Sequence, residues 1–99
     1  MELDWALLDA AKHGDIQQVK RLIVRGADIH YQDKEGYNAL MKAARTGHWH
    51  VLRVLLDVGA EVQEANRYGE TALMVAAFGG HRRAVQTLLA ADADIHATK

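Results

Sequence analysis

The sequence contains no cysteine, no proline and no serine among its 99 residues. Without cysteine, disulfide bonds, thiolate metal ligands and cysteine nucleophiles are all excluded. Without serine, a serine nucleophile is excluded as well. The lack of cysteine is compatible with a reducing compartment, and we expect a cytoplasmic or other intracellular location.

Net charge and long apolar runs are also lacking. The formal net charge is −1, so the basic footprint that is typical of nucleic-acid-binding domains is absent. No unbroken apolar run approaches the roughly 20 residues of a membrane-spanning helix. The acidic start of the chain, Met1 to Asp4, does not resemble a secretory signal. We therefore expect neither a nucleic-acid partner nor a membrane.

The main feature that is present is an internal repeat of 33 residues. At this offset the chain matches itself at glycines and apolar residues: Gly36 with Gly69, Ala39 with Ala72, Leu40 with Leu73, Met41 with Met74, Ala43 with Ala76, Gly47 with Gly80, and Leu55 with Leu88. Carried backward, the same offset reaches Ala6, Leu7, Ala10, Gly14, Leu22 and Gly26. The period predicts one domain, residues 1–99, made of three units near 1–32, 33–65 and 66–98.

Apolar spacing within each unit predicts two helices. The middle unit shows it most clearly, with Ala39, Leu40, Ala43 and Ala44 on the first helix and Val51, Leu52, Leu55 and Leu56 on the second. Asn38 and Thr71 are predicted helix N-caps. Gly47 is predicted to end the first helix, and Gly59 to take the left-handed conformation after the second.

These residues resemble the ankyrin repeat, whose pattern is Asp-x-x-Gly-x-Thr-Pro-Leu-His-x-Ala-Ala-x-x-Gly-His followed by Val-Val-x-x-Leu-Leu-x-x-Gly-Ala. The middle unit follows this pattern from Asp33 to His48 and from Val51 to Ala60. The resemblance covers all three units. It implies an all-α solenoid of helix–turn–helix units joined by hairpin-like loops.

Two departures from the pattern affect the expected structure. The pattern's proline is replaced by alanine, at Ala6, Ala39 and Ala72. Asp92 stands where Gly26 and Gly59 stand in the first two units. If the backbone there is left-handed, aspartate is less favourable than glycine, and we expect Asp92→Gly to stabilise the domain.

The resemblance implies a non-catalytic module that binds a protein partner through its concave helix face and loop tips. Carried over position by position, these surfaces hold eleven candidate partner-binding residues: Lys34, Glu35, Tyr37, Arg45, Thr46, Arg67, Tyr68, Glu70, Phe78, Lys12 and His13. Tyrosine, phenylalanine and arginine are enriched at the energetic centres of protein interfaces. The mixed charge of this set argues against a strongly acidic or strongly basic partner on that face.

Two alternative functions remain open. The chain is also interpretable as a structural or engineered repeat scaffold. Alternatively, it is a fragment of a longer array that self-associates through its C-terminal unit. Repeat arrays need a polar terminal unit, whereas the third unit keeps Leu73, Val85, Leu88 and Leu89.

Catalysis and metal binding find little support. His48 and His50 form a His-x-His pair and His81 is the repeat equivalent of His48, but neighbouring helices lie too far apart for these rings to share a zinc ion. We interpret His48 and His81 as structural residues of the turns. No acidic pair has a pocket signature. We therefore expect no enzyme activity, no metal and no cofactor.

Overall fold

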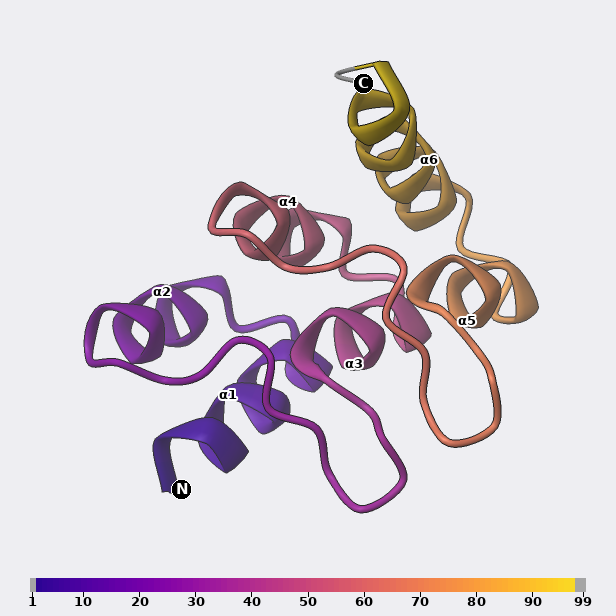
Figure 1. Cartoon of the computed structure of the whole chain (residues 1–99). Coiled ribbons are helices and arrows are strands. Elements are labelled where there is room, and N and C mark those ends of the chain that lie inside the picture. The colour runs from indigo at the N-terminus through magenta and orange to yellow at the C-terminus, as the bar shows by residue number, and fades with distance from the viewer. Residues whose placement is uncertain (1, 98–99) are drawn as a thin grey trace.

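The computed structural model describes residues 2–97, with side chains through Asp92, and consists there of six helices without strands. The helices are α1 (Glu2–His13), α2 (Ile16–Val24), α3 (Ala39–Arg45), α4 (Trp49–Asp57), α5 (Ala72–Phe78) and α6 (Arg82–Ala97). They form three antiparallel pairs, α1–α2, α3–α4 and α5–α6 (Figure 1). The expected all-α repeat fold is confirmed.

The pairs stack so that equivalent helices are neighbours. Helix α3 packs between α1 and α5, and α4 packs between α2 and α6, which gives two rows of helices (Figure 1). The loops that lead into α3 and α5 project side by side from the row of α1, α3 and α5 (Figure 1). Because the offset is the same throughout, residues 33 positions apart hold equivalent places in neighbouring pairs.

In the middle and third pairs, a side chain caps the N-terminus of the first helix. The Met41 N–H donates to the Asn38 side-chain oxygen at 2.9 Å, and the Met74 N–H donates to the Thr71 hydroxyl at 3.4 Å. Each cap satisfies one of the amide groups that a helix start leaves without a partner. The predicted N-caps Asn38 and Thr71 are confirmed.

A glycine follows the end of α4, whereas α6 continues through the equivalent position. Gly59 has a φ of +104°, so its predicted left-handed conformation is confirmed. Asp92, 33 residues later, lies inside α6, and no non-glycine residue in the described part has a positive φ. The left-handed backbone on which the Asp92→Gly expectation depended is therefore not present, because alanine-rich sequence without a glycine continues the helix. The reason for expecting Asp92→Gly to stabilise the domain is therefore gone.

The core is formed by both rows of helices. Small and large apolar side chains from the first helices, such as Leu7, Leu40 and Ala44, meet larger ones from the second helices, such as Leu52 and Leu55. Each buried leucine contributes about 1.5–3 kcal/mol relative to an exposed one. Because equivalent pairs share these contacts, each pair is stabilised mainly by its neighbours.

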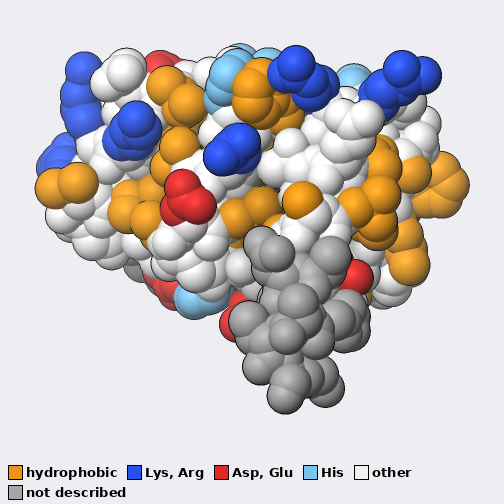
Figure 2. Space-filling model, turned by 90° about the horizontal axis from the view of Figure 1, so that it is seen from above, with side chains coloured by type: hydrophobic (Ala, Val, Ile, Leu, Met, Phe, Trp, Pro, Cys, Tyr) orange, Lys and Arg blue, Asp and Glu red, His pale blue; other side chains and the backbone are white. Residues whose placement is uncertain are grey.

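The outer surface of the α2–α4–α6 row, which we call the back face, has uneven charge. Figure 2 shows lysine and arginine side chains gathered along one edge of this face, with hydrophobic side chains beside them. Exposed cations on these helices are Lys20, Arg21, Arg53, Arg82 and Arg83. In the described part of the chain, no helix combines the length and apolar character needed to cross a membrane.

Candidate functional site

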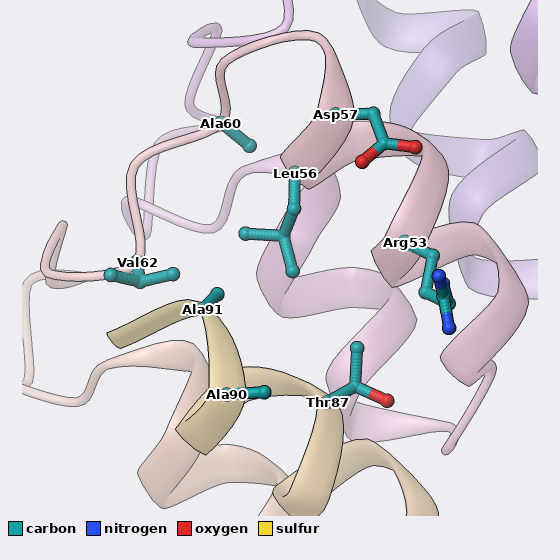
Figure 3. A pocket seen from close by; sticks show the side chains of 8 residues that line it. All are labelled: Arg53, Leu56, Asp57, Ala60, Val62, Thr87, Ala90 and Ala91. Atoms are coloured by element: carbon teal, nitrogen blue, oxygen red, sulfur yellow. The ribbon is translucent and has the colours of Figure 1, made fainter. Parts of the chain in front are cut away.

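Two hollows of the described surface lie on opposite sides of the molecule. One, of about 440 Å³, lies between α4 and α6 on the back face (Figure 3). The other, of about 350 Å³, lies between the projecting loops and the helices α3 and α5. We call the second hollow the inner groove, and its lining residues are Tyr37, Arg45, Glu70, Val75, Phe78 and Gly79.

Asp33 organises the loop beside the inner groove. Its Oδ1 accepts hydrogen bonds from the N–H groups of Tyr37 (2.9 Å) and Glu35 (3.0 Å), and its Oδ2 lies 3.2 Å from the Lys42 Nζ. Burial alone would raise the pKa of Asp33. The hydrogen bonds from Tyr37, Lys42 and Glu35 outweigh burial, and the pKa is held below its ordinary value of 3.8.

Asn66 builds the same turn in the next loop. Its Oδ1 accepts from the N–H groups of Tyr68 (2.9 Å) and Glu70 (3.0 Å), as the Asp33 carboxylate does in the loop before. Its side-chain amide also donates to Glu70 Oε1 at 2.8 Å. The two loops therefore share one backbone shape, although one is centred on a charged side chain and the other on a neutral one.

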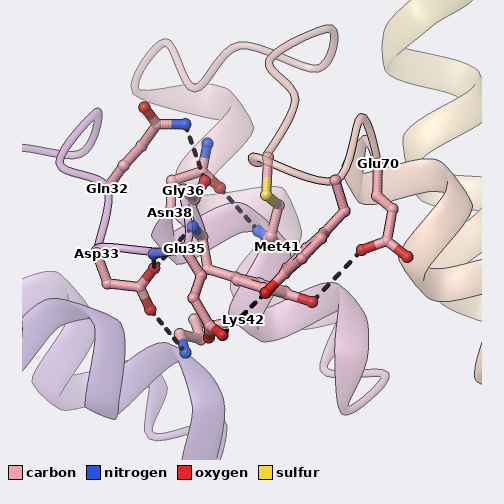
Figure 4. A network of polar contacts seen from close by, with 10 residues as sticks. Gln32, Asp33, Glu35, Gly36, Asn38, Met41, Lys42 and Glu70 are labelled. Carbon is pink, nitrogen blue, oxygen red and sulfur yellow. Dashed lines mark hydrogen bonds and ion pairs between the residues drawn. The ribbon is translucent and has the colours of Figure 1, made fainter.

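Side chains at equivalent positions join the two loops (Figure 4). The Tyr37 hydroxyl donates to Glu70 Oε1 at 3.4 Å, and the Tyr68 hydroxyl donates to Glu35 Oε2 at 3.1 Å. We call these four residues the crossed tie. Burial and the charge of Glu70 raise the pKa of Tyr37, and the hydrogen bond to Glu35 raises the pKa of Tyr68.

The loop backbones approach closely at Gly36. The Arg67 N–H donates to the Glu35 carbonyl oxygen at 3.0 Å. A Cβ atom on Gly36 would lie 2.8 Å from the Arg67 backbone nitrogen, and the φ of Gly36 is +86°. Glycine is required here both by conformation and by space. The loop tips are thus fixed relative to each other by backbone and side-chain contacts.

The inner groove presents an aromatic wall and both signs of charge. Phe78 is 81% exposed, although it is a large hydrophobic side chain. The Arg45 guanidinium lies 6.0 Å from the centre of the Tyr37 ring, and the Glu70 carboxylate lies beside the same ring. The groove therefore combines an exposed aromatic side chain with an arginine and a half-buried carboxylate, and aromatic and arginine side chains are enriched at protein interfaces.

The candidate residues divide into those near the inner groove and those elsewhere. Tyr37, Arg45, Glu70 and Phe78 line the groove itself. The loop tips hold Lys34, Glu35, Arg67 and Tyr68, all exposed. The sequence-based set thus contains four of the groove's six lining residues. It omitted Val75, which stands one turn before Phe78 on α5 and could have been found from that spacing.

Three candidates lie outside the groove. The Thr46 hydroxyl donates to the Lys12 carbonyl oxygen at 3.0 Å and to the Lys42 carbonyl oxygen at 3.2 Å, so it joins α1 to the end of α3. Lys12 lines a smaller hollow with Trp5 and Asp33. His13 contacts Asp9 on its own helix, and it lines a hollow at the N-terminal end of the stack.

The histidines of the turns make packing contacts. The His81 Nε2 lies 2.9 Å from the Arg45 carbonyl oxygen, which connects the third pair to the middle pair. His48 occupies the equivalent place against Gly14 of the first pair. Within the described residues, no three histidine, aspartate or glutamate side chains lie close enough to hold a metal ion.

Comparison with known proteins agrees with this architecture. A family model described as ankyrin repeats, in three copies, matches residues 7–99. The chain belongs to the ankyrin-repeat family. Ankyrin repeats are generally protein–protein interaction modules, and they are typically not enzymes.

Two relatives from Rickettsia felis, both named as ankyrin repeat proteins, are similar over part of the chain. RF_p14 and RF_pd14 are each 46% identical to it over 39 residues, which is 39% of this chain. The matched segment spans 62% of RF_p14 and 59% of RF_pd14. The chain therefore aligns with less than two thirds of either relative.

Proposed function

We propose that residues 1–99 act as one ankyrin-repeat domain that binds a protein partner in the inner groove and on the adjoining loop tips. The observation that carries the proposal is the exposure of Phe78 on the wall of a groove that also holds Arg45 and Glu70. An exposed aromatic of this kind contributes most when a partner covers it. The domain is proposed to be non-catalytic, and an intracellular location stays a prediction supported by the lack of cysteine.

Rigidity of the loops supports the same proposal. The crossed tie and the Arg67–Glu35 backbone hydrogen bond hold the tips in place before any partner arrives. A surface that is ordered in the free protein loses less conformational entropy on binding. Tyr37 and Tyr68 also contribute to this order, so their substitution would alter both the surface and its support.

The test therefore uses Phe78 and Arg45, whose side chains form no hydrogen bond in the described structure. The chain is immobilised and exposed to lysate of the organism that encodes it, and retained proteins are quantified by mass spectrometry. We expect the double variant Phe78→Ala/Arg45→Ala to retain at least about tenfold less of the proteins that the unmodified chain retains.

The matched control is Gln86→Ala, an exposed position on the back face. It should retain the same proteins as the unmodified chain. Equal retention by the double variant and the control would contradict binding in the inner groove. Unfolding curves of all three proteins show whether any difference follows from lost stability.

A second candidate function is self-association through the third helix pair. Met74 is 47% exposed and Leu89 is 49% exposed, whereas their equivalents in the middle pair, Met41 and Leu56, are buried and half-buried. Apolar side chains of the same kind form the contacts between helix pairs inside the stack. We propose that a second copy of the chain covers them.

Light scattering after size exclusion, at several protein concentrations, tests self-association. We expect the mass to rise toward a dimer with concentration, and we expect Met74→Glu to remain a monomer. Val24→Glu, which places the same charge on an exposed valine of α2, should behave like the unmodified chain. A monomer at every concentration would contradict this second function and leave the inner groove proposal unaffected.

A further inference from the structure

The channel between α4 and α6 on the back face has a cationic, aromatic end. The Arg83 guanidinium lies 4.5 Å from the centre of the Trp49 ring. The His50 ring also lies against Trp49, with 3.5 Å between the ring centres. Arg83 thus bridges the two helices at their N-terminal ends. We call this channel, from Trp49 and Arg83 to the hollow of Figure 3, the back groove.

Regular helix spacing places the next cation one turn further along. Trp49, Arg53 and Asp57 follow one another at intervals of four residues, so they form a single row on α4. Arg53 is therefore about 6 Å along the axis of α4 from Trp49, the residue that Arg83 contacts. On the facing helix, Thr87 is one turn beyond Arg83. The back groove therefore has two arginines in sequence along its length.

The far end of the back groove is apolar and open. Figure 3 shows Leu56 pointing between the helices, with Val62 and the small side chains of Ala90 and Ala91 around it. Their small size leaves the hollow of about 440 Å³. Pockets of 300–1,000 Å³ are the size that accommodates bound groups. The hollow is large enough for a bulky apolar side chain.

In the described part of the chain, the two arginines of the back groove form no ion pair with a carboxylate. Arg53, Arg82 and Arg83 are exposed, and no ion pair to them occurs in the described part of the chain. Figure 2 shows lysine and arginine side chains gathered along one edge of the back face. Asp57 is the acidic residue in the lining of the hollow, at its edge. The groove therefore has a positive end and an apolar end.

We propose that the back groove binds an acidic segment of a protein partner in extended conformation, with the order carboxylate–x–carboxylate–x–large apolar residue. In an extended chain, alternate side chains lie on one side and about 6.6 Å apart. This spacing is close to the rise of about 6 Å along α4 from Trp49, which Arg83 contacts, to Arg53. The two carboxylates contact these arginines, and the apolar side chain enters the hollow beside Leu56.

The shape and charge of the groove favour a protein segment over nucleic acid or an anionic membrane. A phosphate backbone carries charge along its whole length, and Asp57 repels it at the apolar end. It also supplies no side chain to fill the hollow. A bilayer surface is broad, whereas the hollow is recessed between two helices.

The test uses the full chain and a fluorescein-labelled peptide in which glycine and serine flank a glutamate–glycine–glutamate–glycine–leucine segment. Fluorescence anisotropy at low salt should show saturable binding with a Kd below about 1 mM. We expect Arg53→Gln and Arg83→Gln each to weaken binding at least about fivefold. Arg25→Gln, the same charge change at the end of α2, should change it less than about twofold.

Two altered peptides and two other anions complete the experiment. Replacing both glutamates by glutamine, or the leucine by glycine, should each weaken binding. Equal effects of Arg25→Gln and the two groove variants would overturn the proposal. A lack of saturable binding up to about 1 mM would overturn it as well. Tighter, Arg53-dependent binding of single-stranded DNA or of phosphatidylserine vesicles would overturn the choice of a protein segment.

Discussion

Equivalent side chains of the middle and third helix pairs have different surroundings. Met41 is 1% exposed and Ala44 is fully buried, whereas Met74 and Ala77, 33 residues later, are exposed. Positions that face the partner helix of the same pair do not differ in this way. Leu55 and Leu88, for example, are both buried. The repeat pattern thus indicates which residues face the next helix pair. Those side chains are buried only where the next pair is present.

Truncation of the two methionines should give the largest contrast. Met41→Ala should lower the free energy of unfolding by about 2–5 kcal/mol, because it leaves a cavity in a filled core. Met74→Ala should cost less than about 1 kcal/mol, because half of the side chain is already in water. Urea unfolding at low protein concentration measures both. Equal losses would show that Met74 is covered in solution.

Alanine at the two loop glycines should give the next largest contrast. Gly36→Ala and Gly69→Ala both place a Cβ in a left-handed backbone, which costs about 1–2 kcal/mol. In Gly36→Ala the Cβ also meets the Arg67 backbone, whereas nothing lies within 4 Å of a Cβ on Gly69. We expect Gly36→Ala to be the more destabilising by about 1–2 kcal/mol. Equal losses in urea unfolding would show that the loops separate in solution.

Exchanging the central residues of the two loops should destabilise the domain at neutral pH in both cases, and both losses should disappear in acid. Asp33→Asn keeps the turn and removes the Lys42 contact, at a cost of about 1 kcal/mol at neutral pH. The pKa of Asp33 is lower in the folded than in the unfolded chain, so its contribution is present above pH 3.8 and is lost as the pH falls below that value. The unfolding curves of the unmodified chain and Asp33→Asn should therefore converge in acid.

The reciprocal change, Asn66→Asp, is the control for that comparison. Val75 stands where Lys42 stands, and the new carboxylate would lie against Glu70. We expect Asn66→Asp to lower the free energy of unfolding at neutral pH and to recover it in acid. A constant difference across the pH range, for either variant, would contradict the stated roles of Lys42 and Glu70.

The smallest expected effects are on the two tyrosines of the crossed tie. Glu35→Gln should return the pKa of Tyr68 to near its ordinary value, because the contact with Glu35 is the main cause of the rise. Glu70→Gln should lower the pKa of Tyr37 only in part, since burial is the first cause there. Both neutral hydroxyls stabilise the fold below pH 10, and this contribution is lost as the pH rises above it. Tyrosinate absorbance in a Tyr31→Phe background measures both values, and an unchanged Tyr68 in Glu35→Gln would contradict the tie.

The fold could be predicted because several local signals agree in each unit. Apolar spacing, the caps at Asn38 and Thr71 and the glycine at Gly59 all specify the same helix ends. The expectation for Asp92→Gly lost its basis because it assumed that the repeat pattern continues where its glycine is missing. A helix end that depends on glycine is not formed when alanine and aspartate occupy the position.

The site was only partly predictable. Tyr37, Arg45, Glu70 and Phe78 were chosen from their repeat positions, and they meet at one groove. The crossed tie was not predicted, although its signal was present, because Glu35 and Tyr37 have Tyr68 and Glu70 at the same offset. The back groove could not be predicted, because it depends on how far α6 lies from α4. That distance follows from packing in three dimensions and leaves no periodic trace in the sequence.

The crossed tie also limits how the units can be rearranged. Glu35 faces a tyrosine and Tyr37 faces a glutamate because the two loops carry the pair in opposite order. Two identical copies of the middle unit placed in succession would set glutamate against glutamate and tyrosine against tyrosine. The two glutamates would then repel each other at the place where the natural loops are joined by hydrogen bonds. The loops therefore determine the order of the units along the stack. Duplicating either unit would remove the two hydrogen bonds of the crossed tie to its neighbour.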